Sequence, residues 1–593
     1  MNFARSKHAA RPVSVAAISL LLTVLASACA APAGTQTAPR GEITRPAGME
    51  ITLIPRRPGG EKVESIDVTL QMREPELGAG DTLLSMAIVR VMAPGALNRP
   101  ETLIAEDASG PLPLTIEEDP VDPSDFRQDR RWKTTRATDG DVTVRYTIEP
   151  RVITSATRPG PLIDTRTELT GFYGSGNTML ALPTSGWPRE VALNWDTSEL
   201  VPGARAASSL GEGDVTATVT AQNLNNSFFF AGPLRSQPDD GAGDFAVYWI
   251  TPPAFDLEDA ASWTQEAYTY FNSFFGASDT PFRIFMRTTE RFQGGGGGGF
   301  NSFIFGTVEG EDRDPDEVRG LLAHEALHHF VGGYGDGGGA GGQQWYSEGV
   351  TNYYTVVLPY RAGLTSLEHY INDFNGFAKS YYTNPQSNLS NAEVTRLFFA
   401  DGNAQIVPYN RGPLYVAQVD ARIRAASGGE LRVDDLIFDF IDGQKEAEDG
   451  VALWHDLVEI YLGDAGSAEF RAMMEGAPLD LPADLFGPCF VAEERLLQNL
   501  VIGFRPYEDE EGRTRAGPIL PGTAAEAAGI ARYDIITNPD ALDAARDAAP
   551  GTPLTLNLLR DTQALTLTYT PWTTPAPGKQ WVRTDVPEEA CEL

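Results

Sequence analysis

Three residues able to hold a metal ion and activate water lie close together near the middle of the chain. Residues 322–330 include His324, Glu325 and His328 in the order His-Glu-x-x-His. On a helix, histidines four positions apart share one face, so both imidazoles can reach the same Zn²⁺ ion. Glu325 is rotated by about 100° from His324, which suits a general base acting on the water that the ion activates. The pattern predicts zinc-dependent hydrolysis.

The flanking residues indicate that this segment is a helix. Asp314 can cap it, Pro315 suits its first turn, and Glu317 stands at the third position. The same motif also occurs by chance as solvated charge on unrelated helices. Three of the six histidines, however, fall within this otherwise apolar stretch, and burying them without partners is costly. We therefore favour a metal site, with His329 directed away from it.

A catalytic zinc ion needs a third protein ligand and a position left open for water. The next acidic residues are Asp336, in a glycine-rich stretch, and Glu348, in a segment expected to form a second helix. Between His328 and Glu348 there are 19 residues, which is enough chain for an antiparallel return. By spacing alone, both acids remain candidates.

The second helix adds a motif that resembles a known family. His-Glu-x-x-His followed by Trp-x-x-Glu-Gly-x-Thr-x-Tyr is similar to the gluzincin metallopeptidases, and within them to the glycyl aminopeptidase family. The resemblance implies one Zn²⁺ per chain, held by His324, His328 and Glu348. Two residues just beyond Glu348 are either partners that orient an imidazole or ordinary helix residues: Thr351 and Asn352.

A third motif, Val-Pro-Tyr-Asn-Arg-Gly at residues 407–412, is expected to open another helix. In similar gluzincins, a Tyr-x-Lys-Gly motif supplies a hydroxyl to the transition state. Tyr409 matches that tyrosine, and Arg411 stands in place of the lysine. Attack of water on a carbonyl builds an oxyanion, which a fixed donor stabilises. The alternative is that Tyr409 is a buried residue that packs the start of the helix.

The resemblance fails upstream of the zinc helix. Aminopeptidases of this group carry a loop resembling Gly-Gly-Leu-Glu-His, whose glutamate binds the free amine of the substrate and whose following edge strand pairs with the substrate backbone. Here a run of six glycines, residues 294–299, is expected to form a loop, and a strand is expected at 300–305. The positions expected to line the substrate are Gly298, Phe300 and Asn301. Since Gly298 cannot bind an ammonium group, another acid replaces the glutamate, the enzyme cuts differently, or its substrates are not peptides.

The N-terminus resembles an export signal. Arg5, Lys7 and Arg11 precede an apolar run at residues 13–25, which is short for a membrane span. Cys29 resembles the lipidated cysteine of a bacterial lipobox, although Ala26 stands where leucine is usual. We expect a signal peptide at 1–28, a lipid-anchored tether at 29–47 and an exported protein at the periplasm or cell surface. The alternative is an ordinary cleaved signal.

The hydrophobic patterns predict a multidomain α+β protein. Residues 48–254 alternate with period two, which indicates an antiparallel β-sandwich-like domain. Residues 255–485 are mainly helical, beginning with a helix at 257–275, and the family resemblance implies a thermolysin-like zinc peptidase domain there. Residues 490–575 are again expected to form strands. Two of these strands lie within 552–569 and are joined by a turn at 560–561. The last segment, 576–593, is expected to be a tail.

The C-terminal domain resembles a PDZ domain. Residues 500–504 are similar to a carboxylate-binding loop, and residues 521–530 to the turn and helix of that fold. Such a domain docks a peptide C-terminus by adding it to a sheet edge; the alternative is a purely structural cover. Two cysteines, Cys489 and Cys591, bracket this domain. In an exported protein we favour a disulfide between them, and the alternative is two free thiols.

Composition limits the remaining possibilities. The 593 residues exceed what one core can hold. A net charge of −35 argues against nucleic-acid binding as the function, since like charges repel. The leading hypothesis is a lipid-anchored zinc metallopeptidase that acts on peptides or proteins. The alternatives are a peptide-binding lipoprotein with a vestigial peptidase, and an endopeptidase or a hydrolase of other amides.

Overall fold

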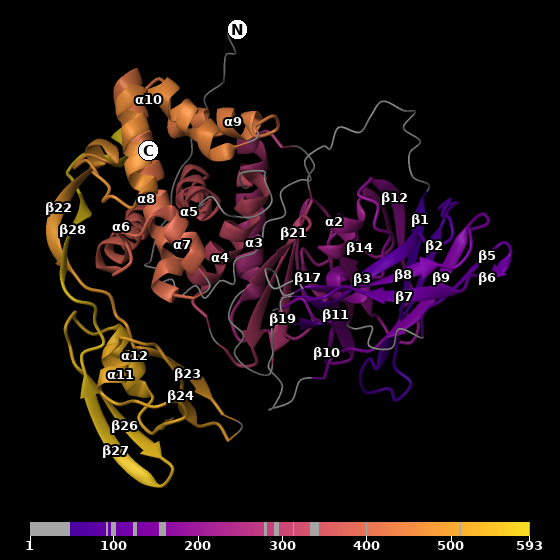
Figure 1. Cartoon of the computed structure of the whole chain (residues 1–593). Coiled ribbons are helices and arrows are strands. Elements are labelled where there is room, and N and C mark those ends of the chain that lie inside the picture. Colours follow the sequence, from indigo (N-terminus) through magenta and orange to yellow (C-terminus); the bar gives the residue numbers. More distant parts are fainter. Residues whose placement is uncertain are drawn as a thin grey trace. The chain divides into compact units, whose positions relative to one another are not determined.

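The computed structural model describes residues 48–593 except 91–92, 96–101, 122–126, 153–161, 278–280, 290–295, 312, 333–342, 399, 448, 510 and 592. The expected signal peptide, the tether and Cys29 lie outside these residues and stay predictions. The described residues form two compact units, one ending at Gly332 and the other following it. Figure 1 shows that strands predominate in the first and helices in the second.

Three sheets build the N-terminal part of the first unit. The seven-stranded sheet has the order β15 (Val215–Val219), β12 (Arg189–Trp195), β1 (Met49–Arg56), β2 (Ser65–Met72), β9 (Val142–Ile148), β5 (Ile104–Asp107) and β6 (Gly110–Pro111). The four-stranded sheet has the order β4 (Ala93–Pro94), β3 (Thr82–Arg90), β8 (Gln128–Thr134) and β7 (Leu114–Glu118). A five-stranded sheet has the order β10 (Arg166–Glu168), β11 (Gly171–Ser175), β16 (Phe228–Gly232), β13 (Arg205–Ser208) and β14 (Gly211–Glu212). Short helices accompany them at α1 (Gly176–Met179) and α2 (Ala221–Asn225).

One hydrophobic core joins these sheets, as the period-two pattern predicts. In β9, every second residue is buried, from Val142 to Ile148. The core combines Val144 of the seven-stranded sheet with Trp132 of the four-stranded sheet and Phe229 of the five-stranded sheet. The expected antiparallel pairing holds for the described pairs of these sheets except β1 and β12, which run parallel.

A second five-stranded sheet leads to the zinc motif. Its order is β17 (Arg235–Gln237), β18 (Phe245–Trp249), β19 (Phe282–Thr289), β21 (Ser302–Val308) and β20 (Gly296–Gly299). The predicted helix is confirmed as α3 (Leu257–Phe275), which connects the parallel strands β18 and β19. This sheet contains strands from both sides of residue 254, where a domain boundary is expected.

The prediction of a loop across the glycine run is wrong for residues 296–299. They form β20, an edge strand antiparallel to β21. A Cβ atom at Gly296 would lie 2.0 Å from the ring of Phe303, and one at Gly299 would lie 2.5 Å from the carbonyl oxygen of Asn226. Glycine therefore serves close packing here. The strand expected at 300–305 begins at Ser302 instead, because residues 300–301 form the turn between β20 and β21.

Helices dominate the second unit, as predicted. They are α5 (Gln344–Arg361), α6 (Leu367–Thr383), α7 (Asn391–Leu397), α8 (Gly402–Ser427), α9 (Val433–Gly443) and α10 (Gly450–Met474). The helix expected to open at residue 407 begins earlier, because the side chain of Asp401 accepts hydrogen bonds from the N–H groups of Asn403 and Ala404 and so caps it. Pro408 and Pro413 consequently lie inside α8.

The expected tail is also wrong, because most of residues 576–593 are built into the fold. Strand β28 (Ala576–Arg583) pairs antiparallel with β22 (Phe490–Leu497). On α6, the side chain of Asn375 accepts from the backbone N–H of Trp581 at 2.8 Å and donates to its carbonyl at 2.9 Å. A disulfide joins Cys489 and Cys591, with Cα atoms 5.4 Å apart. The disulfide is the one favoured from the cysteine positions. The strand pairing and the Asn375 contacts are non-local, so a local pattern does not reveal them.

The C-terminal strands form a sheet with a core of its own. The order is β23 (Phe504–Glu508), β24 (Thr514–Ile519), β25 (Ile535–Ile536), β26 (Leu554–Arg560) and β27 (Gln563–Tyr569). The hairpin of β26 and β27 matches the predicted turn near residues 560–561. Two short helices, α11 (Ala524–Ala527) and α12 (Asp540–Arg546), supply buried Ala525 and Leu542 to this core.

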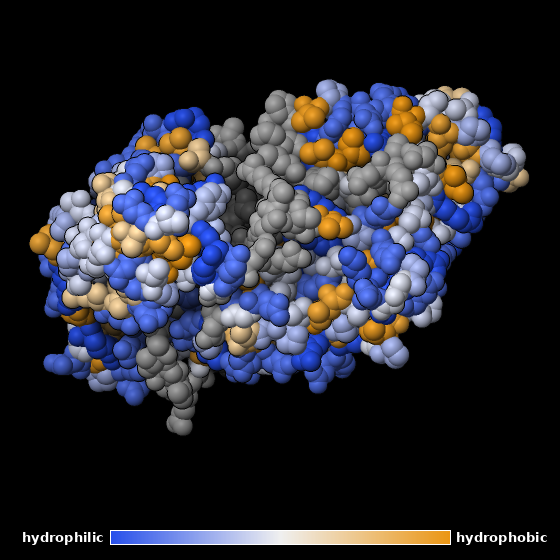
Figure 2. All heavy atoms as spheres, turned by 90° about the horizontal axis from the view of Figure 1, so that it is seen from below, coloured by the Kyte–Doolittle hydropathy of each residue, from blue (hydrophilic) through white to orange (hydrophobic). Residues whose placement is uncertain are grey.

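Hydrophilic residues predominate on the face drawn in Figure 2, where hydrophobic residues form small, separate areas. This surface agrees with the acidic composition of the chain. Among the described helices, none combines the length and the apolar character that a membrane span requires.

Candidate metal centre

The zinc motif lies on α4 (Pro315–Val331), and the local sequence explains why this helix forms. The carboxylate of Asp314 caps it by accepting from the N–H of Asp316 at 2.9 Å, and Pro315 occupies the first turn. Leu322 and Leu327 are fully buried and anchor the helix in the first unit. The predicted helix and its cap are confirmed.

The two histidines of the motif point the same way from α4. Their Nε2 atoms lie 3.1 Å apart, and their rings stand nearly perpendicular to each other. Two nitrogens bound to one tetrahedral zinc ion at about 2.0–2.1 Å would be separated by about 3.3 Å. His324 is 3% exposed and His328 is half-buried. The observed spacing therefore fits ligands of one small cation.

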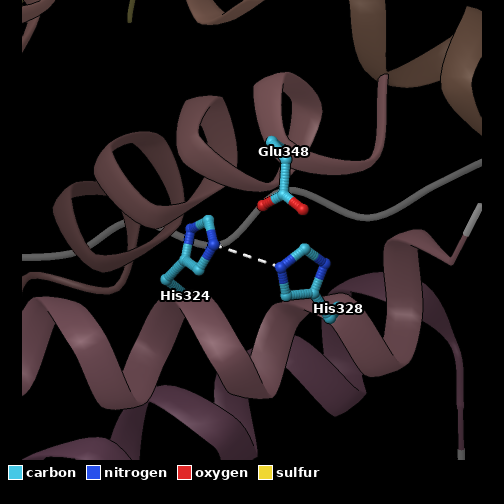
Figure 3. A group of neighbouring side chains, drawn as sticks. All are labelled: His324, His328 and Glu348. Carbon is cyan, nitrogen blue, oxygen red and sulfur yellow. Dashed lines mark hydrogen bonds between the residues drawn. The ribbon is translucent and has the colours of Figure 1, made fainter. Parts of the chain in front are cut away.

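The carboxylate of Glu348, on α5, completes this group. One ligand atom from each of His324, His328 and Glu348 lies within 4.8 Å of the others. Figure 3 shows the carboxylate directed toward the two imidazoles. Two imidazoles and one carboxylate are the donor set of many catalytic zinc sites, which keep a further position for water. The residues present thus fit a zinc ion. Of the two acids that spacing left open, Glu348 lies beside the histidines, and Asp336 lies outside the described residues.

Close packing of α5 against α8 determines where Glu348 lies in the second unit. A Cβ atom at Gly349 would lie 2.5 Å from the Cα atom of Gly412, and one at Gly412 would lie 2.4 Å from the Cα atom of Gly349. The two helices therefore cross with their backbones in contact, which larger residues would prevent. The sequence motifs alone do not predict this role for either glycine, although Gly349 follows Glu348 and Gly412 follows Arg411 directly.

Tyr409 and Arg411, from the third motif, both lie in α8 and are buried there. Tyr409 is 3% exposed. Arg411 is fully buried, and its guanidinium donates to the carbonyl of Leu389 at 2.7 Å and to the side chain of Asn391 at 2.8 Å. Burial lowers the pKa of Arg411 to about 10, so it stays charged at neutral pH. The arginine that replaces lysine in the motif thus connects α8 to the first residue of α7 and to the segment just before it.

The remaining predicted positions lie as follows. Gly298 is an exposed residue of β20, and Phe300 and Asn301 form the turn after it. The hydroxyl of Thr351 donates to the carbonyl of Ser347 at 2.5 Å, and the amide of Asn352 donates to the carbonyl of Tyr409 at 2.9 Å. Roles of these residues in substrate binding or in orienting an imidazole stay predictions.

His329 behaves as the sequence predicts. Its ring packs near Phe282 and Phe330, with centroid distances of 5.8 and 5.2 Å. Burial lowers the pKa of His329 to about 4, so the ring is neutral at physiological pH. It is a half-buried residue that packs against aromatic side chains of the first unit.

Comparison with known proteins agrees with this architecture. The family model described as M61 glycyl aminopeptidase matches residues 340–405, which include α5 and Glu348. No curated protein matches the chain. An aminopeptidase N family protein from Idiomarina loihiensis is 15% identical, with a TM-score of 0.57, and the match covers 90% of this chain and 98% of that one.

Further solved structures have lower scores. The M1 zinc metallopeptidase from Deinococcus radiodurans is 14% identical, with a TM-score of 0.41, and the match covers 77% of this chain and 98% of that one. At such identities the comparisons concern the fold. The likeness to the Idiomarina protein shows a multidomain α+β fold, with a β-rich N-terminal part followed by a helical part.

Proposed function

We propose that this protein is a zinc-dependent metallopeptidase of the gluzincin type. The observation that carries the proposal is the meeting of His324, His328 and Glu348, whose ligand atoms come within 4.8 Å of one another from two helices. The match of residues 340–405 to the glycyl aminopeptidase model and the aminopeptidase-like fold support peptides as substrates.

Different residues of the chain would bind the metal, transfer the proton and stabilise the oxyanion. His324, His328 and Glu348 would hold a zinc ion, which when bound would supply a Lewis acid that lowers the pKa of water. Glu325, 4% exposed and next to a ligand on α4, accepts the proton of the attacking water and returns it to the leaving amine. Tyr409 donates a hydrogen bond to the oxyanion that forms from the peptide carbonyl.

The point of cleavage in the substrate is open to a direct test. The position expected to bind the substrate amine is Gly298, which is exposed on the edge strand β20 and has no carboxylate. An aminopeptidase would need another acid there, whereas an endopeptidase would not. Turnover of the same peptide with a free and with an acetylated N-terminus separates these possibilities, because only an endopeptidase cleaves both.

A second function is peptide docking by the C-terminal sheet. Strand β23 lies at one edge of that sheet, next to the segment 500–504 that resembles a carboxylate-binding loop. An edge strand can accept a peptide as an additional strand.

We include in the proposal a PDZ-like domain here, export of the protein, and a lipid on Cys29. The disulfide between Cys489 and Cys591 supports export, because disulfides persist in oxidising compartments.

The test of the peptidase is the variant Glu325→Gln. It should keep one zinc ion per chain and lose activity by about 100-fold or more, because only the proton acceptor is removed. Glu317→Gln makes the same chemical change in the first turn of α4 and should keep full activity. Zinc content by elemental analysis and turnover of a peptide library are the measurements. Full activity in Glu325→Gln would refute the mechanism.

A further inference from the structure

Helix α8 cannot complete its own hydrogen bonding at Tyr409. In an α-helix, each carbonyl accepts from the N–H four residues later. Four residues after Tyr409 stands Pro413, which is helical but has no N–H. Both residues belong to the buried stretch of α8. A buried carbonyl is costly to leave without a donor, so this position needs a donor from outside the helix.

Asn352 on α5 supplies that donor. Its side-chain Nδ2 lies 2.9 Å from the carbonyl oxygen of Tyr409, and the residue is 3% exposed. Asn352 follows Glu348 by four positions, so the two side chains share one face of α5. Beside them, the contact between Gly349 and Gly412 brings the two helix backbones together.

We propose that Asn352 is a positioning residue that fixes the turn of α8 carrying Tyr409, by giving the Tyr409 carbonyl the donor that the helix lacks. It does so by replacing the helical hydrogen bond that Pro413 removes. The inference rests on the proposed peptidase function, in which Tyr409 donates to the transition state. Because a catalytic donor must be held within about 0.5 Å of its productive position, a turn of α8 loosened at Tyr409 by a carbonyl without a donor would lower kcat and leave substrate binding nearly unchanged.

The first part of the test removes the donor and then returns it. Asn352→Leu keeps a similar side-chain volume without the amide. It should lower kcat by about 10-fold or more, with KM within about threefold of wild type and one zinc ion per chain. Pro413→Ala gives α8 the missing N–H, so Asn352→Leu/Pro413→Ala should recover most of the lost kcat. Pro413→Ala alone should resemble wild type.

The second part separates positioning from mere stability. Tyr409→Phe removes the hydroxyl whose placement Asn352 controls. In that background, Asn352→Leu should cause no further loss of kcat, since coupled residues are not additive. If Asn352→Leu does not fold alone, the comparison of Asn352→Leu/Pro413→Ala with Pro413→Ala carries the test, and near-equal kcat values support the proposal.

Three outcomes would overturn the proposal. The first is unchanged kcat in Asn352→Leu, and the second is an equal loss with and without the Tyr409 hydroxyl. The third is failure of Pro413→Ala to restore activity. Each of these leaves the peptidase function intact, because wild type stays active and Glu325→Gln stays inactive. A wild-type protein that holds zinc yet cleaves no peptide overturns both proposals together.

Discussion

Two buried carboxylates of this protein lie in contrasting surroundings. Asp164, in the first unit, is fully buried and contacts the guanidinium groups of Arg151, Arg166 and Arg287 at 2.7–3.0 Å. Glu348 is 5% exposed and lies among the imidazole nitrogens of two histidines. Arginine carries its positive charge at all ordinary pH values, whereas imidazole binds metal ions in its neutral form. The charge that Asp164 needs is therefore built into the chain, while the group around Glu348 suits a cation from solution.

The largest effect that tests this contrast is expected at Glu348. Glu348→Gln keeps the size of the side chain and removes its charge, so zinc affinity should fall by about 100-fold or more and peptide hydrolysis should fall with it. Elemental analysis after dialysis against a chelator measures the metal. Asp164→Asn should keep its zinc under the same dialysis. Loss of the metal from both variants would remove the distinction between the two sites.

A second effect, on folding stability and not on metal binding, is expected at Asp164. Asp164→Asn leaves fully buried Arg287 without the carboxylate that neutralises it, which should cost about 3–5 kcal/mol. The matched control is Glu106→Gln, because Glu106 forms an exposed pair with Arg145, and that change should cost less than about 1 kcal/mol. Denaturant unfolding followed by tryptophan fluorescence compares the free energies of unfolding of the two variants. Equal losses of unfolding free energy would show that the buried ion pairs of Asp164 stabilise the fold no more than the exposed pair of Glu106 does.

The smallest of these effects is a pH dependence of the first unit. Burial acts to raise the pKa of Asp164, but Arg287 and Arg166 outweigh it and hold the pKa below its ordinary value. A lowered pKa in the folded state means that the stabilisation is complete above the unfolded pKa of about 3.9 and is lost as the pH falls further. The stability difference between wild type and Asp164→Asn should therefore shrink below that pH. A difference that stays constant down to pH 2 would contradict this assignment.

Local patterns predicted the parts of the candidate site that depend on neighbouring residues. The cap at Asp314 and the spacing of His324 and His328 are properties of one helix, and helix geometry alone brings the two imidazoles to one side. The helix at 257–275 was predictable for the same reason. Alternation in strands such as β9 likewise follows from the two-residue repeat of a strand.

Local patterns failed where a distant partner decides the structure. The glycines of β20 suggested a loop by their freedom, yet Phe303 and Asn226 require the absence of side chains there. The end of the chain suggested a tail, yet β28 pairs with β22 and Asn375 of α6 binds its backbone. In both cases the decisive contacts come from other elements, and their energy is not visible in the segment itself.

By itself, the sequence determined that this protein carries a helix with two imidazoles on one face and an adjacent carboxylate. It also determined the order of a β-rich part and a helical part along the chain. Only the tertiary structure decided that Glu348 meets those imidazoles, and that an amide 57 positions away serves the carbonyl of Tyr409. The reason is physical: a helix places its own side chains, but the crossing of two helices depends on how entire faces pack, as at Gly349 and Gly412.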